Sequence, residues 1–145
     1  MFKLHSVRPA FLAVLTALFA AACAAEAGPT LSAPEAFEKA RAGEITLIDI
    51  RTPQEWRQTG IAESALTIDM TRKTFVQEIL DSVGGDKDAP IAIICRTGNR
   101  TTYTQKALQE MGFTHVYNVK EGMAGSGAGP GWVRRGLPVE RCQTC

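Results

Sequence analysis

The segment from Cys95 to Thr101, Cys-Arg-Thr-Gly-Asn-Arg-Thr, combines residue types that suit nucleophilic chemistry on an anion. It follows the apolar run Ile91–Ile94 and precedes a helical pattern, which predicts a tight loop between a strand and a helix N-terminus. Backbone N–H groups of such a loop point inward, and the helix dipole adds about half a positive charge. The centre of the loop is therefore predicted to bind an anion.

Cys95 opens this loop and is the candidate nucleophile. The inward N–H groups and the guanidinium groups of Arg96 and Arg100 favour the thiolate, which is the reactive form of cysteine. Gly98 supplies the backbone freedom that the tight curve needs. An inert cysteine that ends a buried strand is the competing interpretation, but it gives no reason for the arginines, glycine and hydroxyls that follow. The predicted anion-binding residues are Arg96, Thr97, Gly98, Asn99, Arg100 and Thr101.

The N-terminus has the layout of a secretory signal peptide. Lys3 and Arg8 form the positive region, residues 10–25 carry no charge, and the small residues up to Ala27 fit a cleavage site. Cys23 follows three alanines and resembles the attachment site of a bacterial lipoprotein, which is the alternative. An uncleaved anchor is disfavoured, since the apolar run is shorter than the ~20 residues of a spanning helix. We expect a periplasmic or otherwise exported protein, with no membrane contact unless Cys23 is lipidated.

The chain is predicted to comprise a signal peptide (residues 1–27), one domain (28–139) and a short tail (140–145). A domain of this size can bury a substantial core on its own. The 16 basic and 15 acidic residues nearly balance, and they balance fully when two basic residues and one acidic residue leave with the signal peptide. This balance gives no indication of a nucleic-acid partner.

Strand and helix patterns alternate through the predicted domain. Apolar, β-branched runs such as residues 45–50 are typical of strands buried on both faces of a parallel sheet. Ser32 and Glu35 have the spacing of a capping box at the first helix. The predicted strands are 45–50, 65–68, 91–94 and 115–119, and the predicted helices are 34–42, 53–58, 74–83 and 101–111. This order predicts an α/β domain with a mostly parallel central sheet, helices on both faces, and a site beyond the carboxyl ends of the strands.

The segment after the last predicted strand has a different character. Residues 121–131 contain five glycines and almost no bulky side chains, so we expect a flexible loop. Trp132 is expected to return the chain to the core.

Four parts of the sequence together resemble the rhodanese family. The first is the active loop C-R-x-G-x-R followed by Ser or Thr, at 95–101, and the second is the apolar strand with D-x-R and E-aromatic at 47–56. The third is the helix, G-F/Y and strand at 107–119, and the fourth is the G-G, W and G-L-P-V ending at 121–139. The resemblance spans about residues 34–139 and implies a rhodanese-like fold.

The resemblance also implies a two-step sulfur transfer. The Cys95 thiolate takes the outer sulfur of a small anionic donor such as thiosulfate, releases sulfite, and passes the sulfur from a persulfide to a thiol or cyanide acceptor. Arg96 and Arg100 would neutralise the donor, and the loop N–H groups would stabilise the persulfide. Asp49 and Arg51, at the end of the neighbouring strand, are expected to brace the loop through ion pairs, with a surface salt bridge as the alternative. The reaction needs no metal or organic cofactor.

Two departures from the family pattern concern the surroundings of the site. Residues 59–65 replace the family's G-H-I-P-G-A segment and lack its histidine, so we expect local packing to differ more than the chemistry. The glycine-rich insert between Met123 and Trp132 lengthens a loop that runs near the active site in the family, which leaves substrate size and access open.

Three alternative functions are weighed against sulfur transfer. A cysteine phosphatase or arsenate reductase uses the spacing C-x5-R, whereas Arg100 gives C-x4-R, a ring expected to be too small for phosphate. A Cys-His hydrolase is disfavoured because His115, the one histidine after residue 27, falls on a predicted core strand. A non-catalytic binding module of the same fold is disfavoured by the intact Cys95 and loop arginines.

Cys142 and Cys145 form a C-x-x-C pair in the predicted tail. The simplest prediction in an oxidising compartment is a disulfide, which leaves Cys95 as the free thiol. The alternative is a redox pair, in which one reduced thiol attacks the Cys95 persulfide, releases sulfide and closes the disulfide. A metal site is disfavoured, since two thiolates fill only half of a zinc site.

Overall fold

The computed structural model describes residues 28–145. The predicted signal peptide and the candidate lipidation site at Cys23 lie outside the described residues. Among residues 28–145, none of the helices has the length and apolar character needed to cross a membrane.

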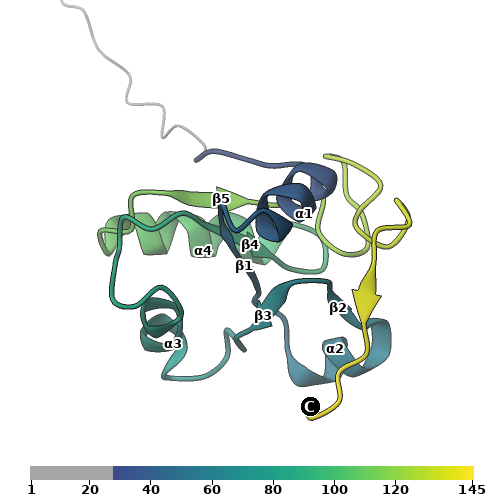
Figure 1. The fold of residues 1–145 in the computed structure, drawn as a ribbon, viewed down its shortest axis with the longest axis horizontal. Coiled ribbons are helices and arrows are strands. Elements are labelled where there is room, and N and C mark those ends of the chain that lie inside the picture. The colour runs from purple at the N-terminus through teal and green to yellow at the C-terminus, as the bar shows by residue number, and fades with distance from the viewer. Residues whose placement is uncertain (1–27) are drawn as a thin grey trace, which may run out of the picture.

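A four-stranded parallel sheet forms the centre of the domain (Figure 1), as the sequence predicts. Its strands, in spatial order, are β3 (Ala65–Thr67), β1 (Thr46–Asp49), β4 (Ile91–Ile94) and β5 (Val116–Asn118). The two central strands are almost fully buried, which explains their continuous apolar sequence. Strand β1 pairs with β4 from Thr46 opposite Ile91 to Asp49 opposite Ile94, so both strands end at the same edge of the sheet.

Three of the helices divide between the two faces of the sheet. Successive side chains of a strand point to opposite faces, so Leu47 and Ile94 pack with Phe37 of α1 (Ala33–Arg41). Ile48 and Ile93 lie in the opposite cluster with residues of α3 (Phe75–Ser82) and α4 (Asn99–Glu110). The short helix α2 (Pro53–Thr59) follows β1 directly. Helices on both faces of a parallel sheet were predicted, and this arrangement is confirmed.

Local sequence signals account for the helix ends. Ser32 and Glu35 form the predicted capping box, in which the Glu35 carboxylate accepts the Ser32 N–H at 2.8 Å. Helix α4 begins at Asn99, two residues earlier than predicted, because Gly98 takes a left-handed backbone conformation (φ 85°) and ends the loop there.

A second, two-stranded antiparallel sheet joins β2 (Ile61–Ala62) to β6 (Val139–Glu140). Neither strand was predicted, because two residues carry no periodic signal. Strand β6 crosses the predicted boundary between domain and tail at residue 139. Figure 1 shows the tail, in yellow, running past β2 and alongside α2 to the C-terminus.

Residues 121–131 are not the flexible loop that their composition suggested. Glu121 is buried, and its carboxylate accepts hydrogen bonds from the N–H of Ala33 at 2.7 Å and of Gly131 at 2.8 Å, and from Arg135 Nε at 2.7 Å. Burial alone raises the pKa of Glu121, but the hydrogen bonds from Arg135, Ala33 and Gly131 outweigh it and lower the pKa. Trp132 then packs edge-on against Phe37, with ring centres 5.6 Å apart. The prediction that Trp132 returns the chain to the core is thus confirmed.

Asp49 and Arg51 form a fully buried ion pair. Arg51 Nη2 lies 2.6 Å from the Asp49 carboxylate, and the Arg51 and Asp49 side chains are 1% and 0% exposed. Arg51 also donates to Thr59 Oγ1 at 2.6 Å and to the Gly60 carbonyl at 2.7 Å, at the end of α2. The pair therefore fixes α2 to the end of β1.

Asp49→Ala should lower the free energy of unfolding by about 3–5 kcal/mol, because it leaves the Arg51 charge buried without its partner. Urea unfolding measures this change. Glu38→Ala, which removes the exposed Glu38–Arg41 pair, is the matched control and should have little effect. A loss in Asp49→Ala no larger than that of the control would contradict a structural role for the buried pair.

Candidate active site

Cys95 lies directly after β4, with its side chain fully buried against the α4 face of the sheet. The backbone N–H of Gly98 donates to Cys95 Sγ at 3.2 Å, and the Thr101 hydroxyl lies 3.6 Å from the same sulfur. The loop thus curls around the sulfur and offers it a backbone donor and a hydroxyl at the N-terminus of α4. The Gly98 N–H and the N-terminus of α4 direct positive partial charge toward the sulfur.

Gly98 makes this curl sterically feasible. It has a positive φ of 85°, and a Cβ at this position would overlap the carbonyl of Lys120. The hydroxyls of Thr101 and Thr102 donate to the Gly98 carbonyl at 2.9 and 2.8 Å and hold the turn in place. A larger residue at 98 would separate the loop from the segment after β5.

Arg100 forms a two-pronged ion pair with Glu55 of α2, at 2.8 and 2.5 Å. The hydrogen bond from Arg100 is the main cause that lowers the pKa of Glu55 to about 2; burial opposes it, and the Thr52 N–H supports it. The pKa of Arg100 is raised chiefly by Glu55, with a smaller contribution from nearby Cys95. Arg100 therefore lies beside the sulfur with its orientation fixed from α2.

Glu55 was not predicted as a site residue. Its one signal in the sequence is the E-aromatic pair Glu55-Trp56 of the family pattern. Nothing local could link it to the loop, because its partner Arg100 is 45 positions away along the chain.

The other predicted anion-binding residues lie around the rim of the loop. Arg96 and Asn99 are exposed, and Thr97 is half-buried. Arg96 lines a cavity of about 470 Å³ that is bounded by α2 on one side and by Met123 and Val133 on the other. Cys95 itself is not part of the cavity wall.

The sequence analysis expected Asp49 and Arg51 to brace the Cys95 loop through ion pairs. Neither side chain forms an ion pair with a loop residue, so this expectation is corrected. They bind each other and the end of α2, and so act on the loop only through Glu55 of that helix. The alternative of a surface salt bridge is also wrong, since both side chains are buried. Arg51 additionally lines the cavity beside Arg96.

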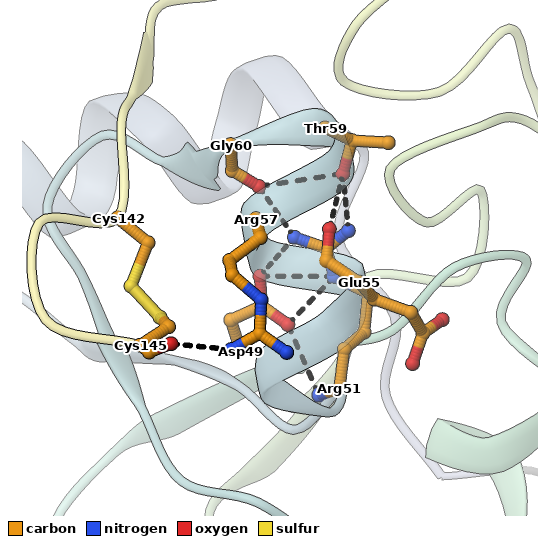
Figure 2. Close-up of a disulfide and its surroundings, with 8 residues drawn as sticks. All are labelled: Asp49, Arg51, Glu55, Arg57, Thr59, Gly60, Cys142 and Cys145. Atoms are coloured by element: carbon orange, nitrogen blue, oxygen red, sulfur yellow. Dashed lines mark hydrogen bonds and ion pairs between the residues drawn. A yellow bond between two sulfur atoms is a disulfide. The ribbon is translucent and has the colours of Figure 1, made fainter.

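Cys142 and Cys145 are joined in a disulfide, and Cys95 is free. Arg57 of α2 donates to the Cys145 carbonyl. Figure 2 shows the disulfide on one side of α2 and the Glu55 carboxylate on the other, as expected for side chains two positions apart on a helix. The tail therefore meets the face of α2 that points away from the Cys95 loop.

His115 precedes β5 and is exposed, so its predicted place on a core strand was wrong. Its Nδ1 lies 2.9 Å from both Thr114 Oγ1 and the Asp88 carbonyl. Within the described part of the chain, no three His, Cys, Asp or Glu side chains gather in a way that could hold a metal ion.

The loop geometry accords with a family match over most of the domain. Residues 32–127 match the model of the rhodanese-like domain. The chain belongs to the rhodanese-like family. Among its relatives is the thiosulfate sulfurtransferase GlpE of Actinobacillus pleuropneumoniae serotype 3, which is 32% identical over 110 residues, or 76% of this chain and 91% of that protein.

Solved structures support the rhodanese-like fold. The polysulfide-sulfur transferase homodimer of Wolinella succinogenes is 28% identical, with a TM-score of 0.61 over 79% of this chain and 80% of that one. Rv0390 of M. tuberculosis has a TM-score of 0.64 at 23% identity, over 81% of this chain and 100% of that one, and is similar in fold.

The Glu55–Arg100 pair should make stability depend on acid pH. Because the folded-state pKa of Glu55 is about 2 against an ordinary 4.5, its contribution is fully present above the ordinary pKa and is lost as the pH falls toward 2. With solvent screening, we expect a loss on the order of 1–2 kcal/mol across this range. Urea midpoints measured along the pH range should fall less steeply for Glu55→Gln than for the wild type and for the control Glu78→Gln. Parallel profiles would contradict the pairing.

Proposed function

We propose that this rhodanese-like protein is a sulfurtransferase in which Cys95 carries the transferred sulfur. The observation that carries the proposal is the position of Cys95 Sγ, 3.2 Å from the Gly98 N–H and 3.6 Å from the Thr101 hydroxyl, at the N-terminus of α4. The Gly98 N–H and the N-terminus of α4 can stabilise a thiolate or a terminal persulfide sulfur. Relatives named as sulfurtransferases support the same reaction class.

The proposed reaction has two balanced steps. First, the Cys95 thiolate attacks the outer sulfur of thiosulfate, a new S–S bond forms, the old S–S bond breaks, and sulfite leaves with the electron pair. Next, a thiolate or cyanide attacks the outer sulfur of the Cys95 persulfide, and the Cys95 thiolate is released. The enzyme needs no external oxidant or reductant. Thiosulfate is proposed as the donor because the relative GlpE is named for it and because the loop is cationic.

Arg100, Arg96 and Gly98 are assigned different roles in this reaction. Arg100 is the loop arginine whose pKa responds to Cys95, and Glu55 fixes its orientation. Arg96 is exposed at the rim and makes no ion pair with any residue from 28 to 145, so its charge is available to an arriving dianion. The Gly98 N–H already donates to Cys95 Sγ, so it lies beside the sulfur to which the delivered sulfur would be attached.

A phosphatase is the second enzymatic candidate, because one structural neighbour, the protein RPA3614 from Rhodopseudomonas palustris, is described as a possible tyrosine phosphatase. Its 23% identity limits the likeness to fold. The C-x4-R spacing of Cys95 and Arg100 argues for the smaller sulfur substrate. A non-catalytic module gives no reason for a backbone N–H directed at the buried sulfur.

We also propose that the protein is exported, on the strength of the sequence of residues 1–27 alone. The intact mass of the protein purified from its native cells tests this. Loss of the first 27 residues is expected, cleavage before Cys23 with an added lipid mass would indicate anchoring, and the full-length mass would contradict export.

Cys95→Ser should abolish sulfur transfer from thiosulfate to cyanide and leave the fold intact, because a hydroxyl replaces the sulfur nucleophile with little change in size. Thiocyanate formation and circular dichroism measure the two properties. Aryl phosphate hydrolysis should be negligible in the wild type. Undiminished transfer by the serine variant, or a robust Cys95-dependent phosphatase rate, would reject the assignment.

Removal of either loop arginine should reduce kcat/KM for thiosulfate. Loss of a charge-assisted hydrogen bond costs ~1.5–3 kcal/mol, or about tenfold to a hundredfold. We expect Arg96→Ala near the lower value and Arg100→Ala near the upper, because Arg100→Ala also leaves the Glu55 carboxylate without its cation. Arg41→Ala, on α1, is the control. Full efficiency of both loop variants at low thiosulfate would contradict their role as anion ligands.

The double variant Cys142→Ser, Cys145→Ser tests the proposed redox pair. Since α2 separates the disulfide from the loop, we expect sulfide release from persulfidated protein, with no external thiol, to be the same as for the reduced wild type. Faster release by the reduced wild type would show that the tail reaches Cys95 and serves as its reductant.

A further inference from the structure

Charged side chains form a large part of the lining of the cavity beside the loop. Four of its lining residues are charged, and two of these charges are already paired: Arg51 binds Asp49, and Glu55 binds Arg100. Arg96 and Arg134 line the same cavity and form no ion pair with any residue in the described part of the chain. The cavity therefore has a net positive character, with one unpaired cation on the loop and a second on the segment that follows Trp132.

The backbone just before Arg134 is hydrogen-bonded to a segment that contacts the loop. The N–H of Val133 donates to the Met123 carbonyl at 3.1 Å, and the N–H of Met123 donates to the Cys95 carbonyl at 2.9 Å. Trp132, which is fully buried, anchors the same segment. The wall that carries Arg134 is thus connected to the nucleophile through two hydrogen bonds.

The wall between the two cations is apolar. Met123, Ala124 and Val133 line the cavity, and Val133 is 48% exposed. A large aliphatic side chain exposed beside an unpaired cation suits a ligand with both hydrocarbon and negative charge.

The size of the cavity favours an organic ligand. Its volume is about 470 Å³, within the range of roughly 300–1,000 Å³ typical of small-molecule sites. An inorganic anion such as thiosulfate would fill only a small part of it.

We propose that this cavity binds the sulfur acceptor, and that the acceptor is an organic thiol with a carboxylate group. Arg134 binds the carboxylate, Met123 and Val133 contact the hydrocarbon part, and the thiol points toward the Cys95 loop past Arg96. The inference rests on the proposed sulfurtransferase function and assigns its acceptor. In the transfer step the acceptor thiolate attacks the outer sulfur of the Cys95 persulfide, the persulfide S–S bond breaks, the acceptor leaves as a persulfide, and the Cys95 thiolate is restored.

Three small thiols that differ mainly in charge test the proposal: 3-mercaptopropionate (anionic), 2-mercaptoethanol (neutral) and cysteamine (cationic). With thiosulfate as donor, the wild type should prefer 3-mercaptopropionate. Arg134→Ala should lower kcat/KM for this thiol by about threefold to tenfold, as expected for an exposed charge-assisted contact, and leave the value for 2-mercaptoethanol unchanged. Arg134→Lys should restore most of the preference, and Arg134→Glu should shift it toward cysteamine. Arg41→Ala is the matched control.

A binding measurement separates this inference from the proposed function. Calorimetric titration of the Cys95→Ser protein with 3-mercaptopropionate needs no sulfur transfer, and should show binding that Arg134→Ala weakens. If 3-mercaptopropionate does not bind, or if its binding and the acceptor preference do not depend on Arg134, the inference is overturned. This holds even if thiosulfate transfers its sulfur to Cys95. Binding that depends on Arg134 would support the site even if thiosulfate fails to load Cys95, in which case the proposed donor reaction is what fails.

Discussion

The short loop around Cys95 is held closed from two sides, and the rest of the site depends on this. On one side the Glu55–Arg100 pair ties the loop to α2. On the other, the N–H groups of Met123 and Ala124 donate to the carbonyls of Cys95 and Arg96, each at 2.9 Å. A loop that opened on either side would withdraw the Gly98 N–H from the sulfur. The chemistry of Cys95 is thus a property of three segments that lie far apart in the sequence.

The two sides are anchored by buried ionic groups rather than by apolar packing alone. Asp49 and Arg51 hold the end of α2 in place. The Glu121 carboxylate accepts hydrogen bonds from two backbone N–H groups and from Arg135, and these bonds fix the glycine-rich segment. Because a buried charge without its partner is costly, each cluster fixes one backbone geometry. This explains how residues 121–131, despite five glycines, can form a defined wall beside the loop.

Much of the fold, and the loop that carries the candidate nucleophile Cys95, could be predicted from the sequence, because their signals are local. The apolar strands, the Ser32 capping box and the contiguous loop from Cys95 to Thr101 are readable over a few residues. The roles of Glu55, Glu121 and Arg134 could not be predicted, since each depends on a partner or a cavity brought together only by the fold. The glycine content of residues 121–131 suggested flexibility, and this prediction was wrong. Composition cannot show that the buried Glu121 carboxylate accepts hydrogen bonds that fix the segment. The same holds for Asp49 and Arg51, whose partners at the end of α2 were not evident from the sequence.

The central claim is that Cys95, and no other cysteine, carries the transferred sulfur. Intact-protein and peptide mass spectrometry after treatment with thiosulfate and no acceptor tests it most directly. The account predicts an increase equal to one sulfur atom, located on Cys95, which 3-mercaptopropionate or cyanide then removes. An unchanged mass of the folded protein, or a sulfur located on Cys142 or Cys145, would contradict it.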